Sequence, residues 1–200
     1  MNVTDPSAMD TIELQYILNH GIWLNYLRGK VCSKDNLPSQ KPKDVRAYII
    51  NTDNSDKTGE HWLAVFFKEN QEAVYFDSYG LPPIHEDIQV FLENNSKIWT
   101  VNTQRLQSLT STVCGQYCIF ALDALAKGYD LNRYLQHMFY KDNFFKNDNS
   151  VMTWFKQNYG QIYKKAQQQL KFDTCQCCKP NQCHHALSMH FPKMSLYKTV

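Results

Sequence analysis

The sequence lacks any apolar run that approaches the roughly 20 residues of a membrane-spanning helix, which argues against a transmembrane protein. The start of the chain lacks the basic residues and apolar stretch of a secretory signal peptide. The net charge is only +2 at pH 7, so composition does not demand a nucleic-acid partner. We therefore expect an intracellular protein, in the cytoplasm or the nucleus, with no membrane partner.

The sequence also lacks internal repeats, and no linker-like segment interrupts it before about residue 172. Its 200 residues suit one compact domain, and a hydrophobic content of 43% is sufficient for a core. We expect a domain over residues 1–172 and a Cys- and His-rich tail over residues 173–200. The seven cysteines are an odd number and four of them crowd into residues 175–183, unlike a secreted disulfide framework.

What the sequence does contain is a succession of helical and strand-like patterns. Asp10 and Glu13 form a capping box that predicts a helix ending near Gly21. Ser150 is the predicted cap of a last helix over residues 151–170. Strands are predicted over 45–50, 61–67, 73–77 and 98–103, and further helices over 84–92, 114–127 and 131–138. Helices grouped around a few adjacent strands predict an α+β domain, a small mixed sheet flanked by helices.

The stretch from Gln107 to Phe120 carries candidate chemistry. A polar, turn-forming run leads into Cys114, and an apolar helical pattern follows, so Cys114 is expected at or next to a helix N-terminus. The partial positive charge there favours a thiolate, and Gly115 would let a substrate backbone approach the sulfur. The side-chain amide of Gln107 could donate to a developing oxyanion. A buried structural cysteine is the alternative for this stretch taken alone.

A second stretch offers the base that a cysteine nucleophile needs. His61 begins one predicted strand and Asp77 ends the next. If these strands pair antiparallel across the turn at residues 68–72, both side chains meet at one edge of the sheet. Asp77 would then orient the imidazole, and Cys114 would complete a thiolate–imidazolium pair. The chain order His, Asp, Cys differs from the order Cys, His, Asn of papain-like proteases.

These residues together resemble the signature of two related groups of cysteine proteases. One group is the adenovirus-type proteases (adenain), and the other consists of the proteases that process SUMO and related ubiquitin-like proteins. The resemblance covers about residues 10–165, and it is closer to adenain in chain length, in the approach to the histidine and in the spacing from Gln to Cys. The residues that carry it are Asn51, Thr52, His61, Trp62, Asp77, Gln107, Cys114 and Gly115.

The resemblance implies an adenain-like fold and a cysteine endopeptidase that cleaves near Gly residues in viral or virus-like precursor proteins. It implies that Trp62 and Gly115 line the substrate groove, that the reaction needs no cofactor, and that a peptide or DNA could act as activator. Adenain has Glu where this chain has Asp77, whereas Asp is usual in the SUMO-type group. A virion location would fit this reading. The implied catalytic roles are general base for His61, orienter for Asp77, nucleophile for Cys114 and oxyanion donor for Gln107.

The tail and the alternatives complete the set of hypotheses. Cys175, Cys178, Cys183 and His184 could bind a structural zinc ion tetrahedrally, or the segment could be an unstructured extension. A deconjugating protease for ubiquitin-like modifiers is the alternative enzyme. A catalytically inactive scaffold with a tail that binds metal or nucleic acid is the alternative outside enzymes.

Overall fold

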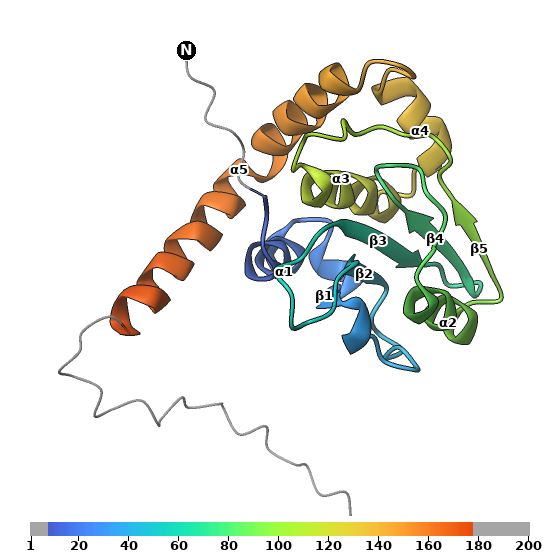
Figure 1. Ribbon diagram of the computed structural model, residues 1–200, viewed down its shortest axis with the longest axis horizontal. Coiled ribbons are helices and arrows are strands. Elements are labelled where there is room, and N and C mark those ends of the chain that lie inside the picture. Colours follow the sequence, from blue (N-terminus) through green and yellow to red (C-terminus); the bar gives the residue numbers. More distant parts are fainter. Residues whose placement is uncertain (1–7, 178–200) are drawn as a thin grey trace, which may run out of the picture. The chain divides into compact units, whose positions relative to one another are not determined.

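The computed structural model describes residues 8–177, of which residues 170–177 are described by their backbone alone. The chain divides into two units, Met1–Ala166 and Gln167–Val200, and the sheet belongs to the first (Figure 1). The division between the units falls within α5. The expected domain boundary at residue 172 stays a prediction. The elements are α1 (Thr11–His20), η1 (Asn25–Leu27), β1 (Lys30–Ser33), η2 (Lys34–Asn36), β2 (Ala47–Asn51), β3 (Trp62–Phe67), β4 (Glu72–Phe76), α2 (Glu86–Asn95), β5 (Ile98–Val101), α3 (Cys114–Ala126), α4 (Leu131–Met138) and α5 (Phe144–Cys177).

The five strands form one mixed sheet in the order β1-β2-β3-β4-β5. The outer pairs, β1–β2 and β4–β5, are parallel, whereas β2, β3 and β4 run antiparallel to one another. Parallel neighbours need a crossover connection, and α2 provides it between β4 and β5. The α+β prediction of a mixed sheet flanked by helices is confirmed.

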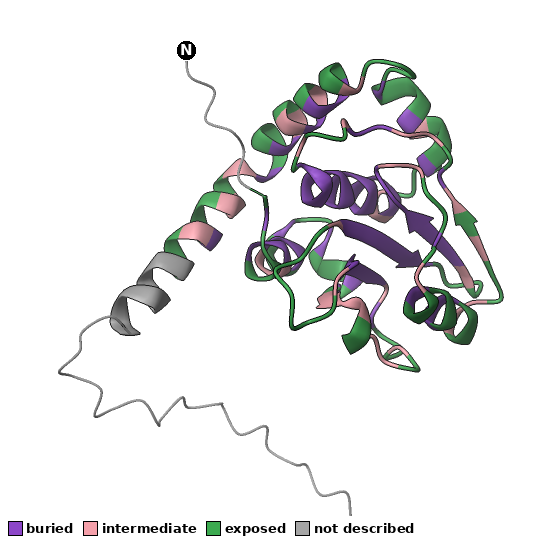
Figure 2. Cartoon of the chain, in the orientation of Figure 1, coloured by how far each residue is buried: buried purple, intermediate pink, exposed green. Residues whose placement is uncertain are grey.

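Successive residues of β3 enter two separate hydrophobic cores. Its even-numbered residues, from Trp62 to Phe66, pack with α1, α3 and α5. Its odd-numbered residues, from Leu63 to Phe67, pack with α2 on the other face. Because helices cover both faces, every position of β3 is buried, and the strand forms a continuous apolar run in the sequence (Figure 2).

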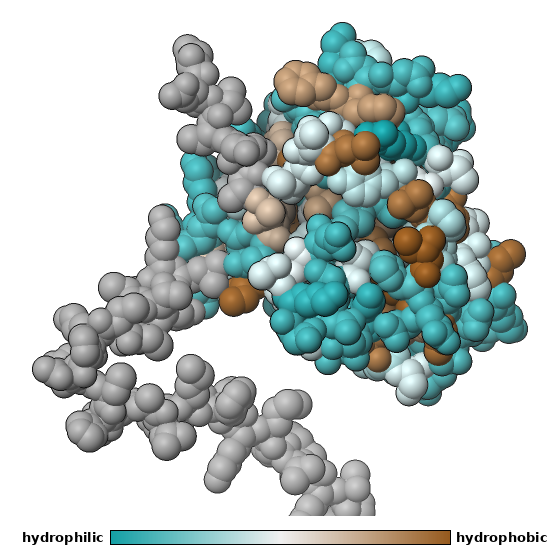
Figure 3. Space-filling model, viewed as in Figure 1, coloured by the Kyte–Doolittle hydropathy of each residue, from teal (hydrophilic) through white to brown (hydrophobic). Residues whose placement is uncertain are grey.

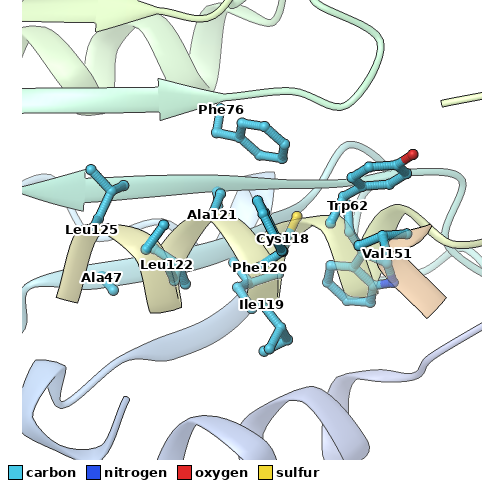
Figure 4. Packing of buried hydrophobic residues seen from close by; sticks show 14 of the residues in the cluster. Ala47, Trp62, Phe76, Cys118, Ile119, Phe120, Ala121, Leu122, Leu125 and Val151 are labelled. Carbon is cyan, nitrogen blue, oxygen red and sulfur yellow. The ribbon is translucent and has the colours of Figure 1, made fainter. Parts of the chain in front are cut away.

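Helix α3 is the centre of the larger core. Its residues from Cys114 to Leu125 are all buried, and Figure 4 shows Cys118 and Ala121 of α3 near Phe76 of the sheet. A helix that is buried all round is enclosed by other elements on every side, and α3 is mostly apolar as this position requires. The first residue of α3 is Cys114, and Val113 at its N-cap makes no side-chain capping bond. The side chain of Val113 therefore does not occupy the N–H groups of the first turn.

Two helix starts illustrate how local side chains set element boundaries. The predicted capping box of α1 is present, since Asp10 Oδ1 accepts from the Glu13 N–H at 2.7 Å. The prediction that Ser150 caps the last helix is wrong. Asn143 accepts from the Lys146 N–H at 3.1 Å instead, and α5 begins at Phe144.

The surface of the molecule is mostly hydrophilic on the face seen in Figure 3, where apolar residues form separate spots. No helix in the described part of the chain combines the length and the apolar character needed to cross a membrane.

Candidate active site

The predicted meeting of His61 and Asp77 follows from the register of β3 and β4. Ala64 pairs with Phe76 in the antiparallel ladder. The same register, continued to the sheet edge, sets His61 opposite Tyr79 and brings Asp77 to a diagonal position on the same face. The His61 Nε2 atom lies 2.9 Å from Asp77 Oδ1. The sheet edge therefore places a carboxylate directly against an imidazole.

Asp77 is fixed by its backbone as well as by its side chain. It is only 4% exposed, and its Oδ1 atom also accepts from the Tyr79 N–H at 2.8 Å. Asn102, just after β5, accepts from the Asp77 N–H at 2.9 Å and donates to the Asp77 carbonyl at 2.7 Å. Sequence reasoning missed Asn102, because its role depends on the pairing of β5 with β4, which the sequence pattern does not reveal.

Cys114 completes the arrangement from α3. It is 7% exposed, lines the same cleft as His61 and is hydrogen-bonded to the imidazole. Because Asp77 engages Nε2, Nδ1 is the ring nitrogen that remains for the sulfur. Tyr79 packs on the imidazole with ring centroids 4.7 Å apart, which restricts the ring plane. Tyr79 was also missed by the sequence analysis.

The charge state of His61 is set by competing effects. Burial alone lowers the pKa of His61, but hydrogen bonds and charges from Asp77 and Cys114 outweigh burial and raise the pKa to about 9. The imidazolium form is therefore favoured at neutral pH, beside the sulfur. By contrast, burial raises the pKa of the Cys32 thiol to about 11 and the pKa of the Cys118 thiol as well. These two thiols stay protonated at neutral pH and are poor nucleophiles.

Gln107 lies in the same cleft and is fully buried as a residue. Its Nε2 atom donates to the Ser111 carbonyl at 2.8 Å, and its Oε1 atom accepts from Ser78 Oγ at 2.6 Å. An amide nitrogen carries two hydrogens, so one N–H of Gln107 remains beyond the bond to Ser111. This geometry is compatible with the predicted oxyanion donor.

A cleft of about 660 Å³ opens over these residues. Its lining comes from the N-terminal segment 8–11, the end of β1 and the loop before β3, together with the residues around Cys114. Asp77 does not line the cleft, but it contacts His61, which does. The lining residues include Ala8, Met9, Asp10, Thr11, Val31, Cys32, Ser33, Asn51, Asn54, Ser55, Lys57, Thr58, Gly59, Glu60, His61, Trp62, Tyr79, Gln107, Ser111 and Cys114.

The two residues predicted to bind substrate differ in placement. Trp62 lines the cleft, and its indole N–H donates to the Met9 carbonyl at 2.9 Å. Gly115 is buried under the N-terminal segment. A Cβ atom there would lie 3.2 Å from Met9 Cβ and 3.3 Å from Leu14 Cδ2. Close packing of Met9 and of Leu14 of α1 against α3 accounts for a glycine at this position, and its role toward a substrate stays a prediction.

Asn51 organises the loop that leads to His61. Its Oδ1 atom accepts from the Asp53 N–H at 2.9 Å and from the Glu60 N–H at 3.3 Å. Gly59 has a φ of +90°, and a Cβ atom there would lie 2.6 Å from Asn51 Nδ2. Only glycine combines this backbone conformation with such a close approach. The loop thus delivers the chain to His61 in one defined path.

The proposed zinc ligands of the tail, Cys175, Cys178, Cys183 and His184, lie outside the residues whose side chains are described. Among the residues that are described, no group of three or more His, Cys, Asp or Glu side chains could hold a metal ion.

Comparison with known proteins gives only distant likenesses. No protein-family model matches the chain, and no curated protein is a significant match. The ASFV pS273R protease has a similar solved structure, with 21% identity and a TM-score of 0.36 over 54% of this chain and 44% of that chain. The central domain of the uncharacterized Lpg1148 protein from Legionella pneumophila has 13% identity and a TM-score of 0.47, over 78% of this chain and 98% of that chain. This chain therefore spans less than half of the ASFV protease. Both TM-scores are low, so the function proposed below rests on the site itself.

Proposed function

We propose that the protein is a cysteine endopeptidase with a Cys114–His61–Asp77 triad. The observation that carries the proposal is the double engagement of one imidazole, by the Asp77 carboxylate at 2.9 Å and by the Cys114 sulfur at a helix N-terminus. The nucleophile is paired with a base, and the base with an orienter, which is the arrangement that nucleophilic acyl transfer requires.

The reaction proposed for this site has two halves. The Cys114 thiolate attacks the scissile carbonyl carbon, and the carbonyl oxygen takes up the negative charge. The remaining Gln107 N–H and the backbone N–H of Cys114 are the proposed donors to that oxygen. The tetrahedral intermediate then collapses, the C–N bond breaks, and the His61 imidazolium gives its proton to the leaving amine. In the second half, neutral His61 takes a proton from water, which attacks the thioester and regenerates the thiolate.

The proposed substrate is an extended polypeptide with Gly near the scissile bond, such as a viral or virus-like precursor protein. The proposal of a peptide substrate is supported by the length of the cleft lining, which draws on residues 8–11, the end of β1 and the loop before β3. The Gly preference rests on the resemblance to adenain-like enzymes. The same resemblance makes an activating peptide or DNA a proposed partner.

The deconjugating alternative has one specific observation in its favour, since Asp77 matches the usual residue of the SUMO-type proteases. Such enzymes bind a folded modifier across a broad surface, whereas an endopeptidase reads a few extended residues. The two functions therefore differ in how they treat short peptides.

The test is cleavage of a library of Gly-containing peptides, alongside SUMO and ubiquitin fusions, with and without added DNA. The Cys114→Ala variant is the control for every substrate. We expect Cys114-dependent cleavage of short peptides with an apolar residue near the Gly. Cleavage of the fusions without any peptide turnover would select the deconjugase, and no Cys114-dependent cleavage of either class would support the inactive scaffold.

A further inference from the structure

We propose that Ser78 is a positioning residue that fixes the amide of Gln107 in the orientation needed to stabilise an oxyanion. This inference rests on the proposed function and adds a residue to its machinery. Ser78 and Gln107 are both fully buried, and Ser78 Oγ lies 2.6 Å from Gln107 Oε1. Neither side chain can therefore replace this contact with bulk water.

The contacts on the two ends of the amide decide its orientation. The Ser111 carbonyl can only accept a hydrogen bond, so the atom of Gln107 that faces it at 2.8 Å must be Nε2. The other end is then Oε1, and the Ser78 hydroxyl must donate to it. With both ends held, the second N–H of Gln107 has one remaining direction. Without Ser78, a single bond to Ser111 would hold the amide.

The backbone of Ser78 holds the same partner. Its carbonyl accepts from the Leu106 N–H at 2.8 Å and from the Gln107 N–H at 3.1 Å. Ser78 also follows Asp77 directly in the chain. Ser78, just after β4, is thus bonded in the chain to Asp77, which orients the imidazole, and by hydrogen bonds to Gln107, the proposed oxyanion donor. A substitution that keeps the backbone, such as Ser78→Ala, removes only the side-chain part of this link.

The proposal separates two kinds of cysteine chemistry. Attack on a carbonyl generates an oxyanion and needs Gln107, whereas alkylation by iodoacetamide displaces iodide and generates no oxyanion. Loss of Ser78 should therefore slow acyl transfer and leave alkylation of Cys114 unchanged. If Ser78 only supported the local structure, its loss would also displace the adjacent Asp77 and so slow both acyl transfer and alkylation.

The experiment compares Ser78→Ala, Gln107→Ala and the double variant with wild type. The reactions are turnover of the best library peptide, acylation by the p-nitrophenyl ester of N-acetylglycine, and alkylation by iodoacetamide. We expect Ser78→Ala to lower kcat by about 10-fold and Gln107→Ala by about 100-fold, each with KM within about twofold. The double variant should match Gln107→Ala, because a residue that acts through Gln107 has no effect once the amide is gone. Ser96→Ala, which loses a 2.8 Å bond to the Leu92 carbonyl on α2, is the matched control and should leave all rates unchanged.

Three results would overturn the inference: an unchanged kcat in Ser78→Ala, additive losses in the double variant, or an alkylation rate that falls with turnover. A second readout is hydrogen exchange of the Gln107 side-chain amide by NMR, which should be faster in Ser78→Ala than in wild type. If wild type shows no Cys114-dependent peptide or ester reaction, the proposed function itself fails. That outcome differs from an active wild type whose Ser78→Ala variant is equally active.

Discussion

Two regions at the candidate site are built by different means. The region that carries the candidate chemistry consists of buried polar side chains, and Asp77, Gln107 and Cys114 are all buried at the ends of β4 and α3 or in the loop between β5 and α3. The other region is the loop before β3, where residues 54–60 are all exposed. Each residue of the first group has partners from distant parts of the chain. The exposed loop is held by Asn51 at its two ends and by Asp35, which accepts two hydrogen bonds from Ser55.

This difference indicates that the two regions have different roles, one in catalysis and the other in substrate preference. Buried polar groups that are fully hydrogen-bonded hold a geometry, and a small displacement there is costly. An exposed loop can change its side chains at little cost in stability and can therefore adapt to different substrates. We expect substitutions on the buried side to abolish catalysis and substitutions on the loop to alter substrate preference.

The largest effect is expected for Cys114→Ala. Removal of the nucleophile should lower kcat by about 10³-fold or more, while the fold is retained because the side chain is small. Peptide turnover measures the loss, and circular dichroism checks the fold. Cys118→Ala, one turn further along α3 in the core, is the matched control and should retain turnover. Equal losses of turnover in the two variants would mean that the packing of α3, rather than the sulfur of Cys114, causes the loss.

Asp77→Asn should lower kcat by about 100-fold or more, because an amide would offer its N–H to the imidazole and favour the wrong tautomer. The backbone bonds to Asn102 would persist, so stability should change less than activity. Steady-state kinetics and urea unfolding measure the two effects. Retained activity in Asp77→Asn would remove Asp77 from the triad.

The pH profile should report the His61 environment. The pKa of His61 is raised from 6.5 to about 9, so the protonated form is favoured by folding. Its contribution to stability is complete below pH 6.5 and is lost as the pH rises through about 9. We expect kcat to fall above about pH 9, because the leaving amine then loses its proton donor. In Asp77→Asn, this alkaline decrease of kcat should move to lower pH. An alkaline limb that Asp77→Asn leaves in place would contradict this assignment.

Much of this site could be predicted from the sequence, for physical reasons. The approach of His61 to Asp77 follows from a short turn between two apolar strands, and the position of Cys114 at the start of α3 follows from a polar run before an apolar one. Ser78 and Asn102 could not be found, since their roles depend on contacts across the sheet rather than on local pattern. The short edge strand β1 was not predicted from the sequence either, because its residues alternate neither in burial nor in polarity.

A smaller effect is expected for Trp62→Phe, which tests how the N-terminal segment is held. The variant loses the 2.9 Å bond to the Met9 carbonyl and should lower the free energy of unfolding by about 1 kcal/mol. The change in kcat should stay below about threefold. Trp99→Phe, in the other hydrophobic core, is the control for loss of an indole. Faster proteolysis near residue 9 in Trp62→Phe alone would support the link, and equal stability of Trp62→Phe and wild type would contradict it.

The smallest effect is expected for Lys57→Ala on the exposed loop. Its 3.5 Å ion pair with Asp53 is solvent-exposed at the lysine, so stability should change by less than about 0.5 kcal/mol. Relative rates across the peptide library should shift, whereas Lys43→Ala, outside the cleft, should leave them unchanged. A uniform loss of rate for all peptides in Lys57→Ala would show that the loop serves the chemistry, against the division proposed here.

The central claim is that Cys114, paired with His61, is the reactive cysteine of this protein, and competitive alkylation tests it most directly. Native protein is treated with a limiting amount of iodoacetamide at neutral pH, and the adduct is mapped by mass spectrometry. We predict that Cys114 is modified before the other cysteines, since the thiols of Cys32 and Cys118 have raised pKa values. We also predict that His61→Ala removes this preference. First modification at Cys32 or at a cysteine of the tail, or an unchanged Cys114 rate in His61→Ala, would contradict the claim.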